Sequence, residues 1–236
     1  MRKSYLRMLL AYMKKVYKIE DTLNKLKDNR VNPTYLTSEA ILPVLLGFLV
    51  RIQSLNELKY KIRSKDFQSV ISRKTKLPQI DVIREVLKRI DLSGLEDLTS
   101  SIIKKARENK VFKNGTIDGY TVAAIDGTKL FGSNIKSCPE CCRSKLKNGK
   151  VHAAHNAVFM SLVGNHPRLT IDFELYQGLS DSSKKAEGEL TVAKRLLEKV
   201  GQTYNRLIDI VVYDALACNS IWINHCINKI TPVVHV

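Results

Sequence analysis

The first half of the chain repeats apolar side chains with the period of an α-helix. After Pro78, apolar residues recur three or four positions apart, so they share one face of a helix. This first stripe consists of Ile80, Ile83, Val86, Leu87 and Ile90. A second stripe consists of Leu95, Leu98, Ile102 and Ala106. Ser93 and Glu96 have the spacing of a capping box and predict the start of the second helix.

Two further apolar stretches near the N-terminus are also interpreted as helices. Residues 40–50, AILPVLLGFLV, form the longest apolar run. The run is much shorter than the roughly 20 residues that span a bilayer, so it predicts a buried helix. In residues 1–18, Lys14 and Lys15 interrupt the apolar positions, and no small-residue cleavage site follows. This pattern indicates an amphipathic helix of a cytoplasmic protein.

The second half changes to the pattern of strands alternating with helices. Three segments are strand-like, residues 120–125, 151–164 and 168–176. A helical stripe follows, made of Leu190, Ala193, Leu196, Leu197 and Val200, with Gly201 as its predicted stop. Residues 207–214 are a short apolar run typical of a buried parallel strand, residues 219–228 predict a short helix, and TPVVHV begins another strand. This order predicts a mixed α/β fold.

The charge divides the chain at about the same place. Of its 236 residues, 39 are Lys or Arg and 23 are Asp or Glu, for a net charge of +16. Residues 1–115 hold 25 basic and 12 acidic residues, whereas residues 116–236 hold 14 and 11. A basic balance of this size indicates a polyanionic partner. We therefore expect a basic helical DNA-binding region over residues 1–115 and an α/β domain over residues 116–236.

The cysteines allow two interpretations. Their number is odd, five, and three of them are clustered, which argues against a secreted disulfide framework. Cys138 and Cys141 have the spacing of zinc ligands, with His152 and His155 following. Positions i and i+3 of a strand face opposite sides, so one histidine at most would serve comfortably. Buried thiols are the alternative, and the sequence favours them over zinc.

Two aspartates occupy equivalent places in the α/β half. Asp126 and Asp214 each follow a β-branched run and precede small residues. If the first and fourth strands are parallel neighbours, both carboxylates reach one crevice beyond the strand ends. Carboxylates gathered in this way suit Mg²⁺ or Mn²⁺. The alternative is that each aspartate caps a turn or a helix.

Several motifs in order resemble one family. VAAIDGTKLFGS, CPECC, VHAAHNAV, KAEGELTVAKRLLEKV and IVVYDALACNS are similar to motifs of DDE-type transposases of bacterial insertion sequences, most of all the insertion-sequence-four-like group. The resemblance covers about residues 75–235. It implies a ribonuclease-H-like catalytic domain in which Asp126 and Asp214 are the first and second catalytic carboxylates and ligands of Mg²⁺ or Mn²⁺.

The same resemblance implies a reaction and its partners. The reaction would be metal-dependent strand cleavage and strand transfer in DNA transposition. The partners would be double-stranded DNA, as transposon ends and target, and a second copy of the chain in a homodimer on DNA. The expected location is the cytoplasm, in association with the nucleoid and without a membrane.

The chain departs from this family in two places. Ala217 stands where the family usually has an aromatic residue. The third catalytic acid belongs to a later Tyr…Arg…Glu…Lys signature, but residues 215–236 contain no Asp or Glu. The domain is therefore expected to be C-terminally incomplete and to cleave DNA poorly.

Two alternatives to a transposase remain open. One is a catalytically incompetent DNA-binding remnant or regulator. The other is a metal-dependent nuclease whose site is completed by Glu174 or Glu187. Glu187 and Glu189 are otherwise interpreted mainly as acidic residues favoured at a helix start, although one of them could approach the crevice.

Overall fold

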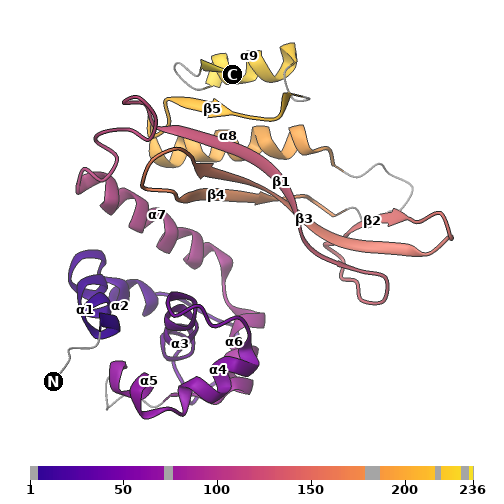
Figure 1. Cartoon of the computed structure of the whole chain (residues 1–236). Coiled ribbons are helices and arrows are strands. Elements are labelled where there is room, and N and C mark those ends of the chain that lie inside the picture. Colours follow the sequence, from indigo (N-terminus) through magenta and orange to yellow (C-terminus); the bar gives the residue numbers. More distant parts are fainter. Residues whose placement is uncertain (1–4, 72–76, 179–186, 216–218, 230–233, 236) are drawn as a thin grey trace. The chain divides into compact units, whose positions relative to one another are not determined.

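The computed structural model of the protein describes the chain apart from residues 1–4, 72–76, 179–186, 216–218, 230–233 and 236 (Figure 1). The chain forms two compact units, residues 1–105 and 106–236. The border falls inside α7 (Leu92–Glu108), whereas the sequence placed it after residue 115. None of the helices in the described ranges is both long and apolar enough to cross a membrane.

The first unit is built from helices. They are α1 (Tyr5–Tyr17), α2 (Ile19–Leu23), α3 (Thr37–Leu49), α4 (Leu55–Ile62), α5 (Lys65–Val70), α6 (Ile80–Arg89) and most of α7. The stripe predicted after Pro78 forms the inner face of α6, where Ile83 and Val86 are fully buried. Residues 40–50 lie in α3, whose Leu46 is fully buried. These apolar faces meet in one core, which stabilises the unit by roughly 1.5–3 kcal/mol for each large side chain removed from water.

Short polar side chains set the helix starts. Ser54 and Ser64 accept hydrogen bonds from the backbone N–H groups of Glu57 and Phe67 and so cap α4 and α5. The capping box predicted at Ser93 is wrong. Helix α7 begins one residue earlier, and Asp91 Oδ1 accepts hydrogen bonds from the backbone N–H and the hydroxyl of Ser93. Asp91 takes the capping position because its carboxylate already lies ahead of the first turn.

The second unit is a mixed sheet covered by helix α8. Its elements are β1 (Val122–Ser133), β2 (Cys142–Lys145), β3 (Val151–Leu162), β4 (Thr170–Leu175), α8 (Glu189–Tyr204), β5 (Ile210–Val212), α9 (Ser220–Lys229) and β6 (Val234–His235). The strand order is β2-β3-β1-β5-β6, and β4 also pairs with β3. Strands β1 and β3 are antiparallel, whereas β5 is parallel to both β1 and β6. The long, curved β1–β3 pair dominates the sheet in Figure 1. The predicted mixed α/β architecture is therefore confirmed.

Helix α8 contacts the sheet through its apolar stripe. It packs on β3 and β4, and Ala193, Leu196 and Leu197 are fully buried. The predicted stop at Gly201 is wrong, because the helix continues for another turn to the buried Tyr204. Tertiary burial of that last turn outweighs the weak helix preference of one glycine, which is about 1 kcal/mol.

Two strand predictions also differ from the structure. Strand β1 was expected to end at Ile125, but it runs on to Ser133. Its antiparallel partner explains the difference, since β3 pairs with β1 from Ala123↔Leu162 to Ser133↔Ala153. Strand β2 was not predicted, because its four residues carry little periodic signal. It exists because it pairs with the beginning of β3.

Candidate functional site

The register of the parallel strands places the two predicted aspartates level with each other. Strand β1 pairs with β5 from Val122↔Ile210 to Ala124↔Val212. Asp126 and Asp214 each lie two residues beyond that last pair, and both are exposed. Both residues thus follow the same end of the paired segment. The condition set from the sequence, that the first and fourth predicted strands are parallel neighbours, is met.

Asp126 does not lie at the end of its strand. It pairs with Phe159 of β3 in the middle of β1. What ends near Asp126 is the pairing with β5, which stops at Ala124. The open edge of β1 therefore begins where Asp126 lies, and this edge takes the place of the strand end that the sequence predicted.

A third carboxylate, that of Glu189, contacts Gly127, the residue after Asp126. Glu189 is the first residue of α8. Its Oε1 accepts a hydrogen bond from the Tyr213 hydroxyl at 3.0 Å, and its Oε2 accepts one from the Tyr176 hydroxyl at 3.4 Å. The carboxyl group packs so closely on Gly127 that a Cβ there would collide with it. Glu189 thus adjoins the residue that follows Asp126.

Sequence reasoning interpreted Glu189 mainly as an acid favoured at a helix start, and left open that either Glu187 or Glu189 approaches the crevice. A glycine directly after Asp126 was the one signal of a close approach, and it named no partner. The contact depends on how α8 docks on the sheet, which local periodicity does not encode.

The two tyrosines keep their protons and act as donors. Burial raises the pKa of Tyr213, and the hydrogen bond to Glu189 and the charges of Glu189, Tyr176 and Asp126 raise it further. Burial, followed by the charge of Glu189 and the hydrogen bond to it, raises the pKa of Tyr176 to about 12. Both carboxylates therefore act on Tyr213, which directly precedes Asp214 in the chain.

The ligand oxygens of Asp126, Asp214 and Glu189 do not form a compact group of the kind that surrounds a bound ion. Within the described ranges, the only group of three Cys, His or acidic ligand atoms closer than 4.8 Å to one another is formed by Cys138, Cys141 and His155. Binding of a cation by Asp126, Asp214 and Glu189 therefore requires side-chain rotation.

The other two acids considered from the sequence are held by one arginine. Arg195 donates to Glu174 Oε1 at 2.7 Å and to Glu187 Oε1 at 2.6 Å. Burial opposes ionisation of Glu187, but the hydrogen bonds from Arg195 and the Gln177 N–H and the charge of Arg195 keep its pKa below the usual value. Either acid would have to leave Arg195 to bind a metal. Ala217, the other departure from the family pattern, lies outside the described residues.

The cysteine cluster brings together three of the four predicted ligands. Cys138 Sγ lies 3.4 Å from Cys141 Sγ, and His155 Nε2 lies 3.1 Å and 3.3 Å from these two sulfur atoms. His152 is not part of the group, since its Nδ1 is 2.7 Å from Asn134 Oδ1. The expectation that one histidine at most could join the cysteines agrees with this geometry.

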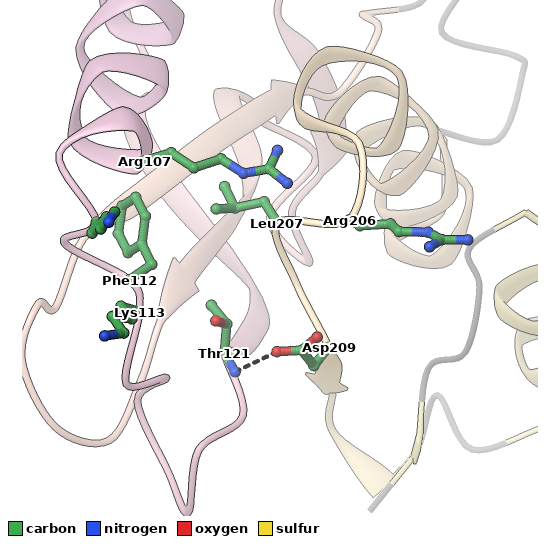
Figure 2. Close-up of a pocket in the computed structure, with 8 residues that line it drawn as sticks. Arg107, Phe112, Lys113, Thr121, Arg206, Leu207 and Asp209 are labelled. Carbon is green, nitrogen blue, oxygen red and sulfur yellow. Dashed lines mark hydrogen bonds between the residues drawn. The ribbon is translucent and has the colours of Figure 1, made fainter.

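A basic cavity of about 370 Å³ lies elsewhere in the second unit (Figure 2). Its lining residues are Arg107, Lys110, Phe112, Lys113, Thr121, Arg206, Leu207 and Asp209. The Thr121 N–H donates to Asp209 Oδ2 at 2.7 Å, the interaction drawn in Figure 2. Both residues precede the paired segments of β1 and β5, whereas Asp126 and Asp214 follow them. The cavity is therefore at the opposite end of the parallel pair from the carboxylates.

Comparison of the chain with known proteins identifies no family but finds a distant structural neighbour. No protein-family model matches the chain, and no curated protein matches its sequence. Among solved structures, a piggyBac transposase synaptic complex with hairpin DNA is similar with a TM-score of 0.41 and 14% sequence identity. The similarity covers 99% of this chain and 51% of that chain, so this chain spans about half of its length.

Proposed function

We propose that this protein is a transposase that cleaves and joins DNA strands with the help of divalent metal ions. The observation that carries the proposal is the parallel pairing of β1 and β5, since Asp126 and Asp214 each follow its last residue pair by two positions, with Glu189 against the neighbouring Gly127. An open α/β sheet commonly binds its ligand beyond the carboxyl ends of its parallel strands. Two exposed acids just past the paired segment favour such a site over turn caps.

The residues fit a hard divalent cation. Asp126, Asp214 and Glu189 offer only carboxylate oxygens, the ligands that Mg²⁺ and Mn²⁺ prefer. Mg²⁺ bound there would activate an attacking oxygen and stabilise a leaving one. Tyr213 and Tyr176 hold the Glu189 carboxylate through their hydroxyl groups and so fix its orientation. Glu189 also supplies, within this chain, an acid that the family pattern would place after Asp214.

The substrate class follows from the charge. The net charge of +16 favours a polyanion, and the first unit carries most of the excess. The motifs from VAAIDGT to IVVYDALACNS favour double-stranded DNA at transposon ends and at a target. A homodimer that binds two such ends would let one copy act on each end.

The test is a cleavage assay on labelled duplex oligonucleotides with Mg²⁺ or Mn²⁺. We expect only weak cutting by the wild-type chain, because residues 215–236 contain no acid, and a further loss of about a hundredfold or more in Asp126→Asn, Asp214→Asn and Glu189→Gln. DNA affinity should be retained in all three. Asp118→Asn is the matched control, since Asp118 is exposed in the turn before β1, at a positive φ that asparagine tolerates.

Each other outcome has a defined meaning. Cutting that persists in Asp126→Asn and Asp214→Asn would refute this site. DNA binding without cutting in every protein, wild type included, would favour the regulator or remnant over the enzyme. Loss of cutting in the aspartate variants alone would remove Glu189 from the site.

A further inference from the structure

The Cys138–Cys141–His155 group lies far along the β1–β3 pair from the paired segment of β5. Strand β3 carries His155 opposite Phe131 of β1. On its other side, Cys142 of β2 lies opposite Ala154, so Cys141 falls opposite His155 just before β2 begins. Cys138 is brought back by a turn in which the Cys141 N–H donates to the Cys138 carbonyl at 3.3 Å. Sheet register thus unites three residues from two separate segments.

The three ligand atoms have the spacing of a metal site. Their mutual distances are 3.4, 3.1 and 3.3 Å. Ligands arranged tetrahedrally around zinc, with bonds of about 2.0–2.3 Å, lie about 3.3–3.8 Å apart. The group therefore needs only a slight expansion to surround an ion.

The chemistry of the group selects among metals. Two sulfur atoms and one imidazole nitrogen are soft or intermediate ligands, which suit zinc and not Mg²⁺. The Cys138 N–H donates to Cys141 Sγ at 3.3 Å, and a donor of this kind orients a ligating sulfur and stabilises its anionic form. Cys141 is buried and Cys138 half-buried, so the sulfur atoms are also partly shielded from solvent.

Two neighbouring side chains that could be further metal ligands, His152 and Cys142, do not join the group. His152 Nδ1 contacts Asn134, and its Nε2 lies 2.8 Å from the place that a Cβ on Gly132 would occupy. Cys142 is the next residue in the strand after Cys141 and so faces the opposite side. Three protein ligands leave a fourth position for water.

We propose that Cys138, Cys141 and His155 bind one zinc ion that anchors the connection between β1 and β2 to β3. The ion joins residues before β2 to the middle of β3. This site is separate from the carboxylates, so its success or failure is independent of the proposed function.

The experiment measures metal in the full-length protein purified under reducing conditions from zinc-supplemented cells. We expect about one zinc per chain by mass spectrometric elemental analysis. Cys138→Ser, Cys141→Ser and His155→Gln should lower the zinc affinity more than tenfold. The matched controls Cys142→Ala, Cys226→Ala and His152→Gln should keep the metal.

A second measurement uses the wild-type chain alone and so does not depend on the folding of any variant. Titration of the metal-free protein with Co²⁺ should give the intense visible bands of tetrahedral thiolate coordination, which zinc then removes. Wild-type protein without zinc and without these bands would overturn the proposal. An oxidised Cys138–Cys141 pair found in reductant-treated protein, or metal loss in Cys142→Ala but not in Cys138→Ser, would overturn it as well.

Discussion

Two aspartates show how differently a carboxylate is used in this molecule. Only 2% of the Asp28 side chain is exposed, and it accepts two hydrogen bonds from the Arg30 guanidinium, at 2.7 and 2.9 Å, and one from the Thr37 hydroxyl. Asp126 is exposed, and in the described part of the chain no hydrogen bond or ion pair engages its side chain. A satisfied, buried carboxylate stabilises a fold, whereas an exposed one at a sheet edge is available to a ligand.

Asp28→Asn should destabilise the first unit. The hydrogen bonds from Arg30 lower the pKa of Asp28 from 3.8 to about 2, although burial opposes them. A carboxyl group whose pKa is lower in the folded state stabilises that state above the unfolded pKa and stops doing so as the pH falls through the folded value. At pH 7 we therefore expect a loss of about 2 kcal/mol in the free energy of unfolding, measured by urea titration.

The pH dependence separates this effect from a general packing defect. The difference between wild type and Asp28→Asn should shrink as the pH falls from about 4 towards about 2. Asp81→Asn is the control, because Asp81 forms an exposed i,i+3 pair with Arg84 and should cost less than about 0.5 kcal/mol. A difference that stays constant with pH would show that the charge of Asp28 is not its source.

At the scale of elements, the docking of α8 on the sheet builds the candidate site. Leu196 and Leu197 fix the helix against the sheet, and the first turn then brings Glu189 over Gly127 of β1. Glu189 thus lies about two helical turns before Leu196 and Leu197, the residues that pack α8 on the sheet. A substitution that disturbs the contact between Glu189 and Gly127 should therefore weaken the packing of α8 on the sheet.

Gly127→Ala should destabilise the second unit by about 1 kcal/mol or less, because the new Cβ displaces the flexible end of the Glu189 side chain and weakens its hydrogen bonds to Tyr213 and Tyr176. The double variant with Glu189→Ala should recover most of this loss, since the colliding group is then absent. Urea unfolding of the wild type, both single variants and the double variant measures the coupling. Thr128→Ala, at an exposed neighbouring position, is the control. Strictly additive effects would show that the two residues do not touch.

At the scale of the whole molecule, the distribution of charge predicts which unit makes most of the proposed DNA contacts. The first unit, residues 1–105, carries an excess of 11 basic residues over acidic ones, 22 against 11, and the second unit, residues 106–236, an excess of 5, 17 against 12. The basic cavity of the second unit concentrates part of that smaller excess in Lys110, Lys113 and Arg206. The two regions can therefore be compared with the same number of charges removed from each.

Replacing Lys59, Lys61 and Arg63 by glutamine should weaken DNA binding more than replacing Lys110, Lys113 and Arg206. All six side chains are exposed, so neither triple variant empties a core. Each lost phosphate contact should reduce the slope of log affinity against log salt by about 0.9. Fluorescence anisotropy of the full-length proteins at several salt concentrations measures both quantities. An equal or larger loss in the second variant, or a wild-type affinity that ignores salt, would contradict the prediction.

The amino-acid sequence by itself determined the elements and their chemistry. Helical stripes predicted α6 and α8, a β-branched run predicted β5, and the similar sequence around Asp126 and Asp214 marked them as an equivalent pair. Strand alternation also limited the cysteine group to one histidine. These features follow from local periodicity, which is set by the burial of one face of each element and is visible in the order of residues.

Only the tertiary structure decided which residues of different elements come into contact. Pairing with β3 carries β1 past Asp126 to Ser133, and docking of α8 brings Glu189 to Gly127. Arg195 engages Glu174 and Glu187 across 21 and 8 residues of sequence, which sets those two acids apart from Glu189. Such contacts depend on register and on helix docking, and both minimise the free energy of the whole unit. No short stretch of sequence contains that information.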